Sequence, residues 1–198
     1  MRKWLLSILA VPAALMPLAA AAQVAPERPA RPTSDEPKNV VYAGMSYTSL
    51  NQVNQSRYGL VGANIEYSRN FGRWFALVGD GAYYFGSFQS GNPGDPTVYH
   101  IMGGVELHAP IFENWNLFGR VLLGGAHTGG EDMTPDLSFA GGPGVGVEHI
   151  FKNSHWGVRA SGDYIGAAFS LRNNSPEQGN SPHRTWNGRA GVGVEYRF

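Results

Sequence analysis

The sequence predicts an all-β fold, an eight-stranded antiparallel up-and-down transmembrane β-barrel. Three observations carry this prediction. Apolar and polar residues alternate with a period of two in eight segments. Each segment can supply the ~9–11 residues that a tilted membrane-spanning strand needs. The connections between the segments alternate between short and long, an asymmetry that is typical of outer-membrane barrels.

The first 22 residues have the pattern of a cleaved secretory signal peptide. Arg2 and Lys3 precede the apolar stretch 4–18, and small residues then precede a predicted cut before Gln23. A membrane-anchoring helix is the alternative reading. It is disfavoured because the stretch is shorter than the ~20 residues of a helical span and is interrupted by prolines.

Composition limits the function classes for the rest of the chain. Residues 23–38 are rich in proline and are expected to form a disordered periplasmic linker, whereas residues 39–198 form the barrel. Cysteine is absent, which excludes disulfides, thiolate zinc sites and cysteine nucleophiles. The mature chain has 15 − 2 = 13 basic and 15 acidic residues. With no clustered basic face, we expect no nucleic-acid partner.

The last segment shows the two-sided pattern most clearly. Phe198, Tyr196 and Val194 share one face, whereas Arg197 and Glu195 share the other. In a strand, residues two apart point the same way, so one face is apolar and the other is charged or glycine-rich. The apolar face suits lipid, and the other face must then line the interior.

The inward faces carry acidic and basic residues in similar numbers. An eight-stranded barrel is barely wide enough for its own side chains. An unpaired buried charge costs several kcal/mol, so we expect these residues to pair and fill the interior. The alternative is a narrow ion path gated by the same pairs. The residues concerned are Glu66, Asp80, Glu106, Arg120, Glu148, Arg159, Asp163, Arg189, Glu195 and Arg197.

Aromatic residues at the segment ends predict the two girdles of a membrane barrel. A soluble lipocalin-like barrel would instead turn its apolar face inward around a ligand. It is disfavoured because the polar face is poor in lysine and rich in glycine, unlike a solvated surface. The predicted girdle residues are Trp74, Tyr83, Trp115, Trp156, Tyr164 and Trp186.

The expected short connections are Asn70–Gly72, Pro110–Asn114 and Lys152–Ser154. The longer and more polar connections then lie at the opposite end, which would face the cell exterior. Pro143 falls inside a predicted strand. It implies a bulge or a locally missing ladder bond, because proline has no N–H.

These residues resemble the eight-stranded outer-membrane β-barrel superfamily, which includes the OmpA transmembrane domain, the OmpX type and the opacity-like surface proteins. The resemblance covers about residues 39–198 and is sharpest in residues 191–198, where Tyr196 and Phe198 match the C-terminal assembly signal. It implies a Gram-negative outer-membrane location. We expect a monomeric or weakly associating barrel without cofactor or metal. The implied partners are outer-membrane lipids and lipopolysaccharide, and during biogenesis the barrel assembly machinery and periplasmic chaperones.

The histidines offer a weaker hypothesis. His127 lies near the external end of its strand, with Thr128, Glu131 and Asp132 close in sequence. Outer-membrane lipid A hydrolases place a His, a Ser and an acidic residue at a similar location, but this chain has Thr after the His. A second pair, His100 and His108, shares an inward face but is too far apart to hold one metal ion.

The favoured interpretation is a non-enzymatic outer-membrane barrel with an envelope-structural or surface-loop binding role. A porin-like channel for ions or small solutes is the alternative, and a lipid A-modifying enzyme is the third hypothesis. Loops on a rigid scaffold often carry binding function. The candidate external loops are Asn51–Ser56, Gln89–Pro96 and Asn173–Pro182.

Overall fold

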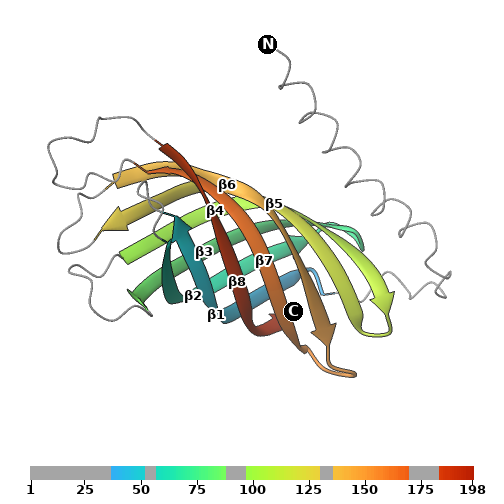
Figure 1. The fold of residues 1–198 in the computed structure, drawn as a ribbon. Coiled ribbons are helices and arrows are strands. Elements are labelled where there is room, and N and C mark those ends of the chain that lie inside the picture. Colours follow the sequence, from blue (N-terminus) through green and yellow to red (C-terminus); the bar gives the residue numbers. More distant parts are fainter. Residues whose placement is uncertain (1–36, 52–56, 88–96, 130–135, 170–182) are drawn as a thin grey trace, which may run out of the picture. The chain divides into compact units, whose positions relative to one another are not determined.

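The computed structural model describes residues 37–51, 57–87, 97–129, 136–169 and 183–198. Residues 37–198 form one compact unit, a barrel of eight strands (Figure 1). The strands are β1 (Asn39–Asn51), β2 (Arg57–Asn70), β3 (Phe75–Ser87), β4 (Thr97–Phe112), β5 (Trp115–Gly129), β6 (Asp136–Ile150), β7 (Trp156–Phe169) and β8 (His183–Arg197). The predicted signal peptide and all but the last two residues of the predicted linker lie outside the described residues.

Each strand pairs antiparallel with its sequence neighbours, and β1 pairs with β8 to close the barrel. Closure leaves no unpaired strand edge, which is the condition for strands to cross lipid. The predicted fold class is therefore confirmed. Among the described residues, no helix is long and apolar enough to cross a membrane.

Both ends of the barrel sequence lie at the same end of the barrel as the three short turns. The backbone N–H of Asn39 donates to the carbonyl of Phe198 at 3.0 Å, and the N–H of Phe198 donates back at 2.9 Å. Each short turn contains one residue with positive φ: Gly72 at 99°, Asn114 at 65° and Asn153 at 56°. Glycine and asparagine tolerate this conformation best, so the turn sequences fit their geometry.

One predicted connection is wrong in its extent. β4 continues through Pro110 to Phe112, so only Glu113 and Asn114 join it to β5. Pro110 pairs with Asn116, and the register shifts between Pro110 and Phe112. Proline is tolerated there because the ladder is already irregular at a bulge, so the N–H that proline lacks is not required.

Pro143 interrupts the β6–β7 ladder, as its sequence position indicated. Gly141 pairs with Gly166 and Gly144 pairs with Asp163, but no pairs form between these two points. The register is the same on both sides of the gap. Pro143 therefore removes a ladder bond without adding a bulge.

Inward-facing glycines allow close approach of neighbouring strands. A Cβ added to Gly104 would lie 1.9 Å from the carbonyl oxygen of Val121, whereas a Cβ on Gly119 would meet nothing within 4 Å. Gly104 lies on the inward face of β4, and Gly119 lies on the outward face of β5. The inner wall thus requires glycine at Gly104 for steric reasons, and the outer wall does not require it at Gly119.

The two faces of the barrel wall differ in chemistry. The outer face is an apolar surface that includes Met45 at 70% and Ile101 at 74% exposure. A continuous apolar surface of this kind is suited to lipid. The inner face has two parts: an apolar cluster at the end with the long connections, and a charged network that extends to the short turns.

Candidate functional site: the barrel interior

The predicted interior charges all lie inside the barrel. Nine are buried, and Arg197 is 13% exposed in its side chain. With two histidines they form one connected set of contacts, which we call the interior network. Its members come from seven strands and comprise six carboxylates, four arginines and two histidines: Glu66, Asp80, His100, Glu106, His108, Arg120, Glu148, Arg159, Asp163, Arg189, Glu195 and Arg197.

Arg120 of β5 lies at the centre of the network. Its Nε donates to Asp163 Oδ1 at 2.8 Å and its Nη2 to Asp163 Oδ2 at 3.0 Å, a bidentate pair. Its Nη1 donates to Glu66 Oε1 at 2.8 Å. One guanidinium thus joins β2, β5 and β7 across the interior, a geometry that arginine provides and lysine does not.

Arg159 of β7 extends the network toward the short turns. Its Nη2 contacts Glu106 and lies 3.5 Å from Glu66 Oε2, and its Nη1 lies 3.9 Å from Glu148 Oε2. The guanidinium carbon also lies 3.8 Å from the ring centroid of Phe118. A cation over a ring face adds to the stability of a desolvated site. Arg159 therefore has partners on several sides.

The network ends beside the short turns with Arg197 of β8. Its Nη2 lies 2.8 Å from Glu148 Oε1 and 2.9 Å from Glu195 Oε1. His108 lies next to the same carboxylates, with Nε2 3.2 Å from Glu106 Oε1 and Nδ1 3.5 Å from Glu148 Oε1. Three carboxylates, those of Glu106, Glu148 and Glu195, therefore lie close together at this end, and His108 and Arg197 lie between them.

Toward the long connections the network ends at Arg189. Its Nε donates to Asp163 Oδ2 at 2.8 Å and its Nη1 to Asp80 Oδ1 at 2.7 Å. His100 Nε2 lies 2.9 Å from Asp80 Oδ1 and 2.8 Å from Arg189 Nη1, so its tautomer decides whether it donates to Asp80 or accepts from Arg189. The ring of Tyr84 lies 5.7 Å from that of His100 and begins the apolar cluster.

His100 and His108 are the two network members that are not among the predicted interior charges. Their position on the inward face of β4 is the sequence signal that indicates them. The four arginines and six carboxylates have a net charge of 4 − 6 = −2. The two imidazoles lie next to the carboxylates, where protonation would make the interior neutral.

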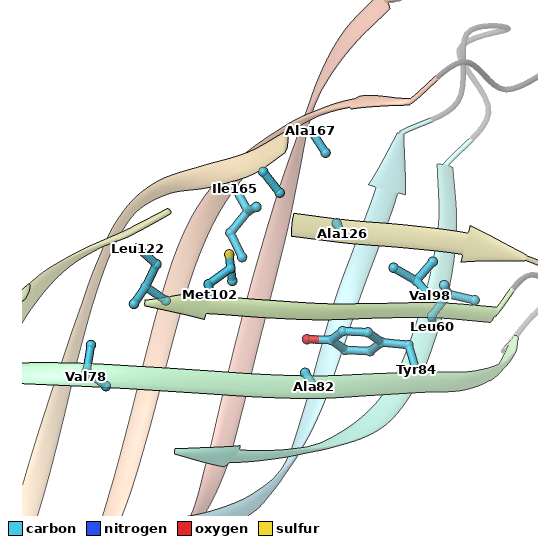
Figure 2. Packing of buried hydrophobic residues seen from close by; sticks show 11 residues of the cluster. Leu60, Val78, Ala82, Tyr84, Val98, Met102, Leu122, Ala126, Ile165 and Ala167 are labelled. Carbon is cyan, nitrogen blue, oxygen red and sulfur yellow. The ribbon is translucent and has the colours of Figure 1, made fainter. Parts of the chain in front are cut away.

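An apolar layer fills much of the interior toward the end with the long connections, although one of its members, Val78, lies near the short-turn end of β3. Met102 of β4, Leu122 of β5 and Ile165 of β7 lie close together, with Tyr84 further along (Figure 2). Leu60 and Leu122 are completely buried. The whole cluster is Leu60, Val78, Ala82, Tyr84, Val98, Met102, Leu122, Ala126, Ala140, Ile165 and Ala167.

The predicted girdle residues divide equally between the two barrel ends, and all are exposed on the outer side. At the end with the long connections, Tyr164 and Trp186 stack with centroids 4.9 Å apart. At the short-turn end, Trp156 packs edge-on against Tyr196, also at 4.9 Å. Tyr83 belongs to the first end, whereas Trp74 and Trp115 belong to the second. Phe198, the other residue of the predicted assembly signal, is exposed at the short-turn end.

His127 and Thr128 point to opposite faces of the wall. His127 stacks on Tyr99 of the outer face, with ring centroids 4.7 Å apart. Thr128 is fully buried inside the barrel. A base and a nucleophile must be within hydrogen-bonding reach, so this pair lacks the required geometry. Glu131 and Asp132, and the candidate external loops apart from Asn51, lie outside the described residues.

The closed antiparallel wall, its apolar outer face and its two aromatic girdles define the class of the protein: a transmembrane β-barrel. The chain belongs to the family described as the outer membrane protein beta-barrel domain, which matches residues 8–198. This membership places the protein in the outer membrane and confirms the resemblance seen in the sequence.

Solved structures of outer-membrane barrels have the same fold. Neisserial surface protein A is 13% identical with a TM-score of 0.63, and the match covers 83% of this chain and 100% of that one. The attachment invasion locus protein Ail of Yersinia pestis is 18% identical with a TM-score of 0.56 and the same coverage. At these identities the likeness shows the fold alone. A search of curated protein sequences finds no match.

Proposed function

We propose that the protein is a non-enzymatic outer-membrane barrel whose interior is sealed and whose role is carried by its external loops. The observation that supports this most strongly is the filled interior. A network of paired charges fills the interior from the short turns past the middle of the barrel. The apolar layer fills much of the rest, together with the buried polar side chains of Thr48, Thr128, Ser138 and Asn187. An ion would have to displace the paired charges and then pass apolar side chains that cannot replace its hydration.

The four connections at the other end are the parts that such a scaffold presents to the exterior. Residues 52–56, 88–96, 130–135 and 170–182 join strands at the end opposite the short turns. A rigid barrel holds the ends of these connections in fixed positions, which is how scaffolds support binding loops. The attachment role named for Ail, a structural relative, is compatible with this proposal.

The proposal is tested by trimming the loops and leaving the barrel intact. Residues 89–95 and 174–181 are replaced by short Gly-Ser linkers, and the variant is returned to a deletion strain beside the wild type. Folding of each variant is checked by the difference in gel mobility between boiled and unboiled samples. The readouts are attachment of cells to surfaces and resistance of the envelope to detergent.

We expect the trimmed barrel to fold but not to restore attachment. If it restores attachment as fully as the wild type does, the loops do not carry the role. If detergent resistance is lost on deletion and both forms restore it, the protein acts through its barrel wall as an envelope component.

A channel remains the second candidate because of the charged half of the interior. Arg120 and Glu106 lie within this half, with Arg120 Nη1 4.0 Å from Glu106 Oε2. A rearrangement of such pairs could open a polar path there, but the apolar layer would still have to part. A steady current that disappears when Arg120 or Glu106 is substituted would support this candidate.

A further inference from the structure

Three exposed cations lie at one corner of the short-turn end, where β1, β2 and β3 meet. Lys38 immediately precedes β1, Arg69 is the penultimate residue of β2, and Arg73 lies in the turn between β2 and β3. The backbone holds this corner together. The N–H of Asn70 donates to the carbonyl of Lys38 at 2.7 Å, and Asn39 pairs with Arg69.

Each arginine of the corner lies beside an exposed aromatic ring. The guanidinium carbon of Arg69 is 5.7 Å from the ring centroid of Phe71, and that of Arg73 is 5.7 Å from Trp74. Phe71 and Trp74 are 54% and 53% exposed. Aromatic rings of this kind sit at the headgroup level of a bilayer, so the guanidinium groups are placed at the depth of the lipid phosphates.

Among the described residues around this corner, 37–41 and 67–77 include no Asp or Glu. Asp35 and Glu36, which precede Lys38 in the sequence, lie outside the described residues. The other two short turns differ: Glu113–Asn114 has no cation, and residues 151–155 have one lysine, Lys152. The cations are therefore concentrated on one side of the barrel rim.

We propose that this basic corner, formed by Lys38, Arg69, Arg73, Phe71 and Trp74, binds the phosphate of an anionic phospholipid. The lipid belongs to the leaflet that meets the short-turn end. Guanidinium groups form paired hydrogen bonds to phosphate oxygens, and the lysine adds a third positive charge. The rings lie at the membrane–water interface, where they pack beside the headgroup that the cations bind. A zwitterionic lipid offers the same phosphate with a compensating cation and binds more weakly.

The experiment uses Trp74 as a local reporter. In a W115F/W156F/W186F variant the mature barrel keeps Trp74 as its tryptophan. The variant is reconstituted into vesicles of zwitterionic phosphatidylcholine containing equal fractions of either brominated phosphatidylglycerol or brominated phosphatidylcholine. Bromine quenches tryptophan at short range. We expect the quenching to show that phosphatidylglycerol binds beside Trp74 with an affinity about fivefold higher than that of phosphatidylcholine. A ratio of about fivefold is what one surface cation contributes when it fully contacts an anionic headgroup.

Two matched controls keep the proposal falsifiable. Adding K38Q/R69Q/R73Q should make the two brominated lipids quench Trp74 equally, whereas adding K152Q should leave the preference unchanged. A second reporter variant that keeps Trp156, beside the turn after β6, should show no preference. Unboiled gel mobility confirms that every variant is folded.

Three results would overturn the proposal. The first is equal quenching of Trp74 by both lipids in the unmodified corner. The second is an anionic preference that survives K38Q/R69Q/R73Q. The third is an equal preference at Trp156, which would show a general attraction of the rim to negative surfaces and no site at this corner.

Discussion

Replacing Arg120 by methionine tests whether the interior network stabilises the barrel through specific pairing. Arg120 makes three short charge-assisted hydrogen bonds, two to Asp163 and one to Glu66. At about 1.5–3 kcal/mol each, their sum would be about 4.5–9 kcal/mol. Both carboxylates keep a second cation, however: Arg189 at 2.8 Å from Asp163 and Arg159 at 3.5 Å from Glu66.

The expected loss is therefore smaller than the sum. We expect R120M to lower the free energy of unfolding by about 3–5 kcal/mol, the range for breaking a buried ion pair. The assay is reversible urea unfolding in phosphatidylcholine vesicles, followed by tryptophan fluorescence. R120M/E66Q should recover part of the loss, because it removes the charge of a carboxylate that R120M leaves with a single cation.

The control is K152M at the exposed turn after β6, which should change stability by less than about 0.5 kcal/mol. A loss of less than about 1 kcal/mol in R120M would show that water, and not pairing, satisfies these carboxylates. A double variant less stable than R120M would also contradict the reasoning, because Glu66 would then be stabilising without its arginine.

The other predictions concern the wall and its assembly. G104A should destabilise the barrel by about 1–3 kcal/mol because its Cβ meets the carbonyl of Val121, whereas G119A should be nearly neutral; equal urea midpoints would contradict this. P143A should stabilise the β6–β7 seam by about 1 kcal/mol, since the new N–H can complete the ladder. Hydrogen exchange at the seam should slow, and an unchanged rate would refute this. F198A should lower the amount of folded protein in the outer membrane but leave unassisted refolding in detergent unchanged; a similar loss in both would point to stability, not to an assembly signal.

The sequence was most informative about which side of the wall each residue occupies. Alternation with a period of two, combined with low charge and aromatic segment ends, is sufficient to place Glu66 and Arg120 inside and Tyr164 and Trp186 outside. The same reasoning gives the number of strands and their order, because consecutive antiparallel strands with short turns can close in only one simple way.

The partners within the network could not be predicted in the same way. Asp80 and Arg189 are 109 residues apart and meet across the interior, so their contact depends on the register of every strand pair between them. The positions of His100 and His108 on the inward face of one strand do not indicate which carboxylates they contact. The end of β4 was also missed, since proline usually indicates a turn, and the bulge at Pro110 that tolerates it depends on the pairing with β5.

The measurement that tests the sealed interior most directly is single-channel recording of the wild-type barrel in a planar bilayer. The charged half and the apolar layer together predict no steady current above that of the bare bilayer in concentrated potassium chloride. A steady ohmic conductance that is reproducible between insertions and altered by R120M would contradict a sealed interior. The protein would then have to be regarded as a narrow channel.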